Sequence, residues 1–200
     1  VRWPGTIEPG TVINDIISQE DWMPTLLAAA GEPDVVEKLK DGYMANGTEW
    51  RVHPDGYNFM PFFEGETDEG PRSQIFYFGQ EGDLNAVRWN DWKIHFARLD
   101  GNIADSQRIV TGWPTIINLR ADPYEEMWME SDMYIRWMGD NMWLFVPIQE
   151  EVSKFIASLE GYPFQEGQSL NAAGINYRSL RAMNILQQIR ERGVLESGYQ

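Results

Sequence analysis

The sequence contains no cysteine and only two histidines. The lack of cysteine excludes disulfide bonds and zinc sites built from thiolates, although it does not identify the cellular compartment. His53 and His95 are far apart in the sequence, and neither has a carboxylate beside it in metal-ligand spacing. They therefore support neither a zinc site nor a catalytic triad. His53 stands before Pro-Asp-Gly and is expected in a turn, whereas His95 is expected to be a hydrogen-bonded structural residue on a strand.

Positive charge is also scarce, because 16 Lys and Arg residues stand against 31 Asp and Glu residues, for a formal net charge of −15. A nucleic-acid partner is not expected, since phosphate groups are bound by clustered Lys and Arg side chains. An anionic substrate would equally need a local cluster of cations. No segment approaches the roughly 20 consecutive apolar residues of a membrane-spanning helix, so no membrane association is predicted.

Bulky apolar residues, by contrast, are abundant. The 200 residues are 42% hydrophobic and include nine Trp, nine Phe and nine Met, which is enough for one good-sized domain. We expect most of these side chains in the core. Some of the tryptophans would instead be free to form a platform for stacking against sugars, and the candidates are Trp50, Trp89, Trp92, Trp113, Trp128, Trp137 and Trp143.

The first part of the sequence predicts the end of a strand followed by two helices. Val1 to Pro4 is the predicted strand end. Ser18 followed by Asp21 has the signature of a helix N-terminus, and Gly31 is expected to end that helix. A short second helix is predicted from about Asp34 to Lys40. Trp22, Leu26 and Ala29 fall on one face of the first helix.

Aromatic and β-branched runs predict an antiparallel sheet between about Tyr57 and Leu119. Along the third run, apolar and other residues alternate as they do in a strand that is buried on one face only. In that strand Trp92, Ile94 and Phe96 point one way, and Lys93, His95 and Ala97 point the other. The four predicted strands are Ile75 to Phe78, Leu84 to Trp89, Asp91 to Ala97 and Thr115 to Leu119.

Helical spacing of apolar residues dominates the rest of the chain. Ser131 is predicted to cap a helix that carries Tyr134, Ile135, Met138 and Met142. Pro147 is predicted to open a helix that ends before Gly161, with Ile148, Val152, Phe155, Ile156 and Leu159 on one side. A loop from Tyr162 to Gly174 and a last helix carrying Tyr177, Leu180, Met183, Leu186 and Ile189 should follow. Strands followed by helices predict an α+β fold, in which a four-stranded antiparallel sheet packs against helices.

Three polar motifs could carry chemistry, and none of them is a strong signal on its own. Asp100 to Asp105 resembles a calcium loop, but Ala104 stands where an EF-hand needs an oxygen ligand. The carboxylates Asp122, Glu125 and Glu126 are expected to open a helix, where they favour its dipole. Asn46-Gly-Thr48 matches the acceptor sequence for N-linked glycosylation, which is a weak signal without knowledge of the source.

Eight short motifs follow one another between Arg2 and Gln149. They are Arg2–Gly10, Asn14–Leu27, Asp55–Asn58, Phe76–Phe78, Gly82–Leu84, Asp91–Phe96, Asn118–Pro123 and Val146–Gln149. No single motif is decisive, but in this order they resemble the C-terminal third of arylsulfatases of the formylglycine-dependent type. The resemblance extends to about Asn171, and residues from Gly174 onward depart from it.

The resemblance implies how the chain is organised. Such enzymes have a large α/β domain of the alkaline-phosphatase type, followed by a smaller domain in which a four-stranded antiparallel sheet packs against a helix. By this resemblance, residues 1–54 would be the end of the large domain, with a strand and helix up to about Gly31 and then a linker. Residues 55–200 would be the small C-terminal domain.

The resemblance also implies which parts of the enzyme are not in this sequence. The formylglycine of the family is made from cysteine or serine in C-x-P-x-R or S-x-P-x-R, and neither motif is present. The calcium ligands and the catalytic Lys and His residues lie upstream of a Trp-Pro-Gly like Trp3 to Gly5. No catalytic, cofactor-binding or metal-binding residue is therefore assigned here, and calcium and formylglycine are implied for the complete enzyme only. The loop after the Asp-Trp-Lys strand can approach the active-site mouth, which makes Arg98, Arg108 and Trp113 candidate residues of the substrate rim.

Two functions remain open at this point. The first is the C-terminal region of an arylsulfatase, a sulfuric ester hydrolase, which would not be catalytic by itself. Its partner would be the N-terminal sulfatase domain, a periplasmic or secreted location would suit the complete enzyme, and the uncovered face of the isolated chain would drive self-association. The second is an autonomous, non-catalytic module of the same fold that binds a glycan or a protein. An independent enzyme is disfavoured, since the sequence shows no nucleophile with a base.

Overall fold

The structure is a computed structural model, and it describes residues 1–79, 82–101 and 107–162. The chain divides into two compact units, one of residues 1–77 with 84–163 and the other of residues 78–83 with 164–200. Of the second unit, the described residues form a turn in which the Gly79 N–H donates to the Asp83 carbonyl at 2.7 Å. The predicted loop from Tyr162 to Gly174 and the predicted last helix lie, apart from Tyr162 itself, outside the described residues.

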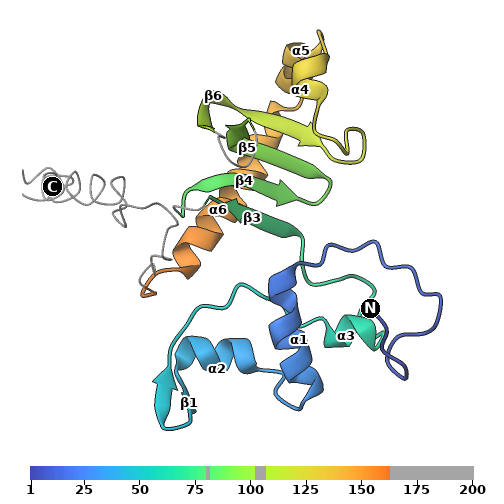
Figure 1. The fold of residues 1–200 in the computed structure, drawn as a ribbon, viewed down its shortest axis with the longest axis vertical. Coiled ribbons are helices and arrows are strands. Elements are labelled where there is room, and N and C mark those ends of the chain that lie inside the picture. Colours follow the sequence, from blue (N-terminus) through green and yellow to red (C-terminus); the bar gives the residue numbers. More distant parts are fainter. Residues whose placement is uncertain (80–81, 102–106, 163–200) are drawn as a thin grey trace, which may run out of the picture. The chain divides into compact units, whose positions relative to one another are not determined.

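The described elements form an α+β arrangement, as the sequence predicts (Figure 1). The first half holds a 3₁₀ turn η1 (Gln19–Asp21), helices α1 (Trp22–Ala29), α2 (Val35–Asp41) and α3 (Met60–Phe63), and a small hairpin of β1 (Tyr43–Ala45) and β2 (Thr48–Trp50). The second half holds strands β3 (Gln74–Phe78), β4 (Leu84–Trp89), β5 (Trp92–Asp100) and β6 (Gln107–Asn118), then α4 (Met127–Glu130), α5 (Tyr134–Asp140), η2 (Met142–Leu144) and α6 (Phe145–Ser158).

The large sheet has four strands in the order β3-β4-β5-β6, each next to its neighbour in the sequence. This confirms the predicted four-stranded antiparallel sheet. The tight turn at Asn90 and Asp91 fixes the register of β4 and β5, in which Val87 pairs with Ile94 and Ala86 with His95. Asn90 has φ of 51°, a left-handed conformation that asparagine tolerates better than most residues.

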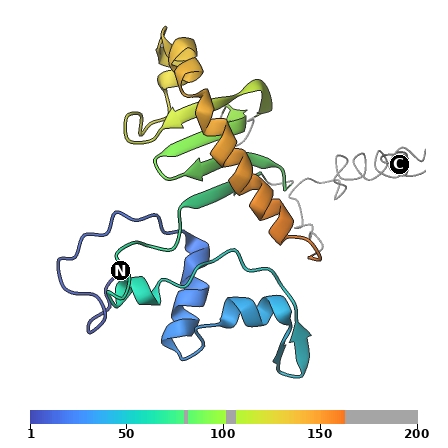
Figure 2. The same cartoon turned by 180° about the vertical axis from the view of Figure 1, so that it is seen from behind.

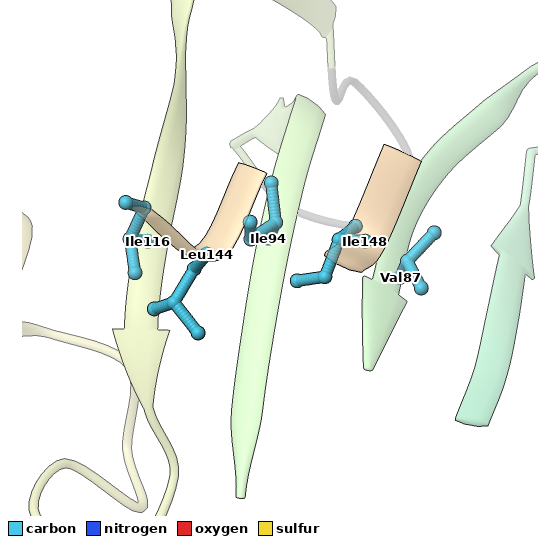
Figure 3. Close-up of a cluster of buried hydrophobic side chains, with 5 residues drawn as sticks. All are labelled: Val87, Ile94, Ile116, Leu144 and Ile148. Carbon is cyan, nitrogen blue, oxygen red and sulfur yellow. The ribbon is translucent and has the colours of Figure 1, made fainter. Parts of the chain in front are cut away.

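The core lies between this sheet and α6, which crosses one face of it (Figure 2). Val87, Ile94 and Ile116 come from three adjacent strands, and Leu144 and Ile148 come from η2 and α6. Figure 3 shows these five side chains gathered between strands and helix. Trp92 and Phe96 pack against the same cluster, so the predicted burial of one face of the third strand is confirmed.

Two details of the helices differ from the prediction. α5 begins at Tyr134 with Met133 at its N-cap, whereas Ser131 was the predicted cap. α6 begins at Phe145, so that Pro147 lies inside the first turn, where its missing N–H leaves no intrahelical hydrogen bond unmade. The Tyr134 hydroxyl lies at the outer edge of β6, where it accepts a hydrogen bond from the Ile116 N–H at 2.9 Å and donates to the Ile116 carbonyl at 3.0 Å.

The predicted start of the first helix is confirmed, and the buried side of the helix is not its apolar face. The Ser18 N–H donates to the Asp21 carboxylate at 2.8 Å, as expected of the capping signature. The buried residues of α1 are Pro24 and Thr25, however, while Leu26 is 55% exposed and Ala29 is exposed as well. The polar Thr25 is inside because its hydroxyl donates to the Asp21 carbonyl at 2.6 Å and accepts from the Phe59 N–H at 3.0 Å.

The predicted strand end at Val1 to Pro4 is also wrong, since these residues run into a turn in which the Ile7 N–H donates to the Trp3 carbonyl at 2.9 Å. A strand needs a neighbour to pair with, and the described part of the chain places none beside these residues. The hairpin β1–β2 and the short helix α3 were not predicted. Among the residues described, no helix has both the length and the apolar character needed to cross a membrane.

Candidate functional site

The three predicted rim residues lie on the strands of one hairpin, not on a loop. Arg98 belongs to β5, and Arg108 and Trp113 belong to β6. The prediction of a loop from Arg98 to Trp113 is therefore wrong over most of its length. The two strands extend farther than expected because they continue to pair, from Ala97 opposite Val110 to Asp100 opposite Gln107.

Arg98 and Arg108 do not converge on one point. Arg98 pairs with Ile109 and Arg108 pairs with Leu99, so the two arginines are at adjacent positions of the ladder and leave the sheet on opposite faces. The Arg98 guanidinium lies 3.7 Å from the ring centroid of Trp128 on α4, in cation–π contact. The Arg108 Nε donates to the Asn85 Oδ1 on β4 at 2.8 Å.

Trp113 lies where the pairing of β5 and β6 is interrupted. His95 pairs with Thr115 and Ala97 with Val110, so one residue of β5 faces four of β6, Thr111 to Pro114. The extra residues form a large, irregular bulge in β6. Within it the Trp113 side chain is 63% exposed, and the buried hydroxyl of Thr111 has no hydrogen-bond partner in the part of the chain that the structure describes. The bulge thus presents an aromatic ring to solvent on an otherwise regular sheet.

The polar face of β5 carries a compact group of charges. The Glu125 Oε1 accepts a hydrogen bond from the Lys93 Nζ at 2.6 Å. The other carboxylate oxygen, Oε2, lies 2.7 Å from the His95 Nε2. The Lys93 ammonium also lies 4.7 Å from the ring centroid of Tyr77 on β3. Glu125 is held in a left-handed backbone conformation, with φ of 59°. Strand β5 and the turn before α4 therefore meet in one ion-pair cluster, beside which Tyr77 of β3 lies.

The surroundings shift the pKa of both titratable partners downward. Burial lowers the pKa of His95 below its ordinary 6.5, and the nearby Lys93 and Arg98 charges lower it further, against the opposite effect of Glu125. Burial would raise the pKa of Glu125, but the hydrogen bond and charge of Lys93, followed by those of His95, bring it below its ordinary 4.5. The Glu125 carboxylate is thus held between Lys93 and His95. The cluster does not place a free base beside a nucleophile.

Two predictions about carboxylates and histidines agree with this geometry. His95 is a hydrogen-bonded structural residue, as expected. Asp122 caps α4, because its carboxylate accepts from the N–H groups of Glu126 at 3.1 Å and Met127 at 2.8 Å. His53 lies in irregular structure, with its Nδ1 3.0 Å from the Asp55 Oδ1 and its ring edge-on to Tyr162.

No metal site emerges among the described residues, where no group of three or more His, Asp or Glu side chains could hold an ion. Most of the rejected calcium loop, from residue 102 to 105, lies outside them. The tryptophans do not form a single platform. Trp92 stacks with Trp137 at 6.0 Å and contacts the exposed Trp143 at 6.4 Å, whereas Trp50 and Trp113, which are also exposed, lie on β2 and β6.

The sequence motif Asp55-Gly-Tyr-Asn58 has a structural role that sequence analysis missed. The Tyr57 N–H donates to the Asp21 carboxylate at 2.8 Å, and the Asn58 Oδ1 accepts from the Met60 N–H at 2.9 Å at the start of α3. Gly56 is buried against the backbone of Glu20. The motif therefore joins the segment before α3 to η1 and α1, which lie on the other side of the predicted boundary at residues 54 and 55. The domain division itself stays a prediction.

Comparison with known proteins gives a consistent answer. No family model matches the chain. Human arylsulfatase A is 34% identical over 98 residues, which is 47% of this chain and 16% of that protein. Human steryl-sulfatase is 28% identical over 102 residues, 48% of this chain and 15% of that protein. The chain thus matches about one sixth of the length of these curated relatives.

A solved structure extends the likeness of the fold. The PsFucS1 sulfatase from Pseudoalteromonas sp. superposes with a TM-score of 0.61 and 24% identity, over 82% of this chain and 30% of that one. This identity is low enough that the superposition shows the fold alone. Together the findings make the chain a relative of the sulfatases over about half of its length, and they support its resemblance to the C-terminal part of an arylsulfatase.

Proposed function

We propose that this chain is the C-terminal region of a sulfuric ester hydrolase and does not hydrolyse sulfate esters by itself. The observation that carries the proposal is a sulfatase-related region in a sequence without C-x-P-x-R or S-x-P-x-R. The described residues also offer neither a set of calcium ligands nor a nucleophile beside a base. The chemistry would therefore come from the α/β domain of a longer protein, with this region as its structural complement.

Exposed apolar side chains before and within α1 support such a partner. Val12, Ile13 and Ile17 precede the helix and Met23 and Leu26 belong to it, and the described part of the chain leaves all five exposed. Apolar surface of this kind marks a face that is normally covered. We propose that the large α/β domain of the enzyme covers it.

The hairpin of β5 and β6 is the proposed contribution to the substrate rim. Trp113 supplies an exposed ring, and Arg98 supplies a cation whose position is fixed by Trp128. Cations and rings of this kind suit the anionic group and the organic part of a sulfate ester. The Arg108 side chain is on the opposite face of the sheet from Arg98. Arg108 could therefore contact the substrate together with Arg98 only if the hairpin itself projects into the site.

The test begins with the coding DNA upstream of Val1. If an open frame encodes C-x-P-x-R, the longer protein and the present chain are produced side by side and assayed with 4-nitrophenyl sulfate. We expect hydrolysis by the longer protein, none by the chain alone, and none after replacement of the cysteine of that motif by alanine. Hydrolysis by the isolated chain, or an upstream frame that encodes an unrelated domain, would overturn the proposal.

The rim is tested in the same longer protein. Trp113→Ala and Arg98→Ala should raise KM for the sulfate ester several-fold with a smaller change in kcat, since they remove substrate contacts and no catalytic group. Tyr124→Ala is a matched control, because this ring is also strongly exposed but belongs to the turn before α4. Unchanged kinetics in both rim variants would remove the rim from the proposal and leave the rest intact.

The second candidate function, a non-catalytic binding module, has some support in the exposed rings of Trp50, Trp113 and Trp143. They lie on β2, β6 and η2, so each would bind separately. A glycan that quenches tryptophan fluorescence of the isolated chain, with loss of the effect in Trp113→Ala, would favour this function.

A further inference from the structure

The turn between β1 and β2 holds the sequence Asn46-Gly47-Thr48. Ala45 pairs with Thr48, so Asn46 and Gly47 form a two-residue turn, with φ of 51° and 77°. Both residues adopt the left-handed conformation that such a hairpin turn requires, and Asn-Gly is the pair best suited to it. The local structure therefore fixes where the Asn46 side chain is presented, at the tip of the hairpin.

Nothing in the described part of the chain covers this tip. Asn46, Gly47 and Thr48 are all exposed, as are the remaining residues of β2. A Cβ added at Gly47 would meet no atom within 4 Å. The Asn46 amide has no hydrogen-bond partner among the described residues, and the base of the hairpin is held by the Val52 N–H, which donates to the Leu39 carbonyl at 2.9 Å. The acceptor group is thus accessible while the hairpin remains anchored.

From this geometry we propose that Asn46 is an acceptor site for N-linked glycosylation. It is the single Asn-x-Ser/Thr sequence in the chain, and its middle residue is not proline. In the transfer, the Asn46 amide nitrogen forms a bond to the anomeric carbon of an oligosaccharide carried on a lipid diphosphate. The bond from that carbon to the diphosphate oxygen breaks, the lipid diphosphate leaves with the electron pair, and the amide loses one proton.

The position of the site also suggests what the glycan would do. Met44 and Trp50 lie on the two strands of this hairpin and are 62% and 51% exposed. A hydrophilic glycan at the tip would stand beside these apolar side chains and reduce their access to other molecules. The hairpin and the strands β5 and β6 belong to different sheets, and the modification changes no residue of the proposed rim.

The test is secretion of the full chain from a eukaryotic host behind a cleavable leader. The wild-type protein should carry a glycan, detected as added mass that peptide N-glycosidase removes with conversion of Asn46 to Asp. Thr48→Ala should abolish the added mass, and Thr48→Ser should retain it, while neither changes the left-handed positions of the turn. A known glycoprotein secreted by the same cells controls for the host.

Unmodified wild-type chain beside a fully glycosylated control protein would overturn the proposal. So would a glycan that persists in Thr48→Ala, because it would then be attached elsewhere. Asn46→Asp gives a second reading that does not depend on Thr48: it keeps a residue that tolerates the left-handed conformation, and it should be secreted without the added mass.

Discussion

The guanidinium of Arg72 donates two hydrogen bonds to the carboxylate of Asp21, from Nε to Oδ2 at 2.7 Å and from Nη2 to Oδ1 at 2.6 Å. The two side chains are 3% and 0% exposed. Arg72 also donates to the carbonyls of Asp55 at 2.9 Å and Gln74 at 3.0 Å, and it lies over the ring of Tyr57. Burial opposes its charge, but the hydrogen bond and charge of Asp21 still hold the pKa of Arg72 above its ordinary value. One buried ion pair therefore ties the start of α1 to the segment that leads into β3.

Removal of one partner of this buried ion pair should strongly destabilise the protein. Arg72→Ala leaves the Asp21 carboxylate buried without its counter-ion, and we expect a loss of about 3–5 kcal/mol in the free energy of unfolding. Urea denaturation monitored by tryptophan fluorescence measures it. Arg120→Ala is the matched control: its ion pair with Asp91 is largely exposed, so the expected loss is below about 1 kcal/mol. Equal losses in the two variants would contradict the role given to the buried pair.

Gly56 is required by the close approach of two backbone segments. A Cβ at this position would clash with the Glu20 carbonyl oxygen and lie 3.1 Å from the Pro24 Cδ. Neither obstacle is a flexible side chain, so Gly56→Ala should destabilise the protein by about 1–3 kcal/mol through a shift of the backbone. Gly112→Ala has open space around the new Cβ and should have little effect. Thermal unfolding of the two variants compares them directly, and similar midpoints would argue against the close approach.

The large sheet could be predicted because its strands and turns are marked by patterns within short stretches of the sequence. Alternation along Trp92 to Ala97 identifies the buried face of β5, and Asn90-Asp91 marks the turn that sets its register. β6 was predicted too short, since Gly112 and Pro114 interrupt the pattern that defines a strand. The structure accommodates them in the bulge, where they need no regular partner on β5.

The interactions that join segments distant in the sequence could not be predicted. Asp21 and Arg72 are separated by 51 positions, and Lys93 and Glu125 by 32, with no pattern that pairs these charges among so many others. The burial of Thr25 on α1 could not be predicted for a related reason. The apolar spacing of the helix does not mark Thr25, whose burial is decided by its hydrogen bonds to Asp21 and Phe59. The local sequence pattern therefore predicts the helices and strands, whereas the way in which they pack together depends on specific polar contacts between distant residues.

The cluster around Glu125 should make stability depend on pH. Because the pKa of His95 is lowered in the folded protein, the unfolded chain takes up a proton first as the pH falls below 6.5, and stability is lost down to the folded pKa. The lowered pKa of Glu125 acts in the same direction below 4.5. Urea denaturation from pH 7.5 to 5 should therefore show decreasing stability, with a smaller slope in His95→Gln. An NMR titration of the His95 ring gives the pKa directly, and a value above 6.5 would reverse the expected sign.

The isolated chain should self-associate through the surface that the proposed α/β domain would cover. Leu26 is 55% exposed on α1 beside Met23, so Leu26→Lys should weaken association without loss of stability, because no core contact is removed. Ile135→Lys is the matched control, since this residue is 72% exposed on α5 and lies outside the proposed surface. Light scattering over a range of protein concentrations should show dimers or larger species for the wild type and the control, and a shift toward monomer for Leu26→Lys. A monodisperse wild-type monomer at the highest concentration would mean that the exposed apolar face does not associate in water. That result would weaken the proposal of a covering α/β domain and favour the autonomous binding module.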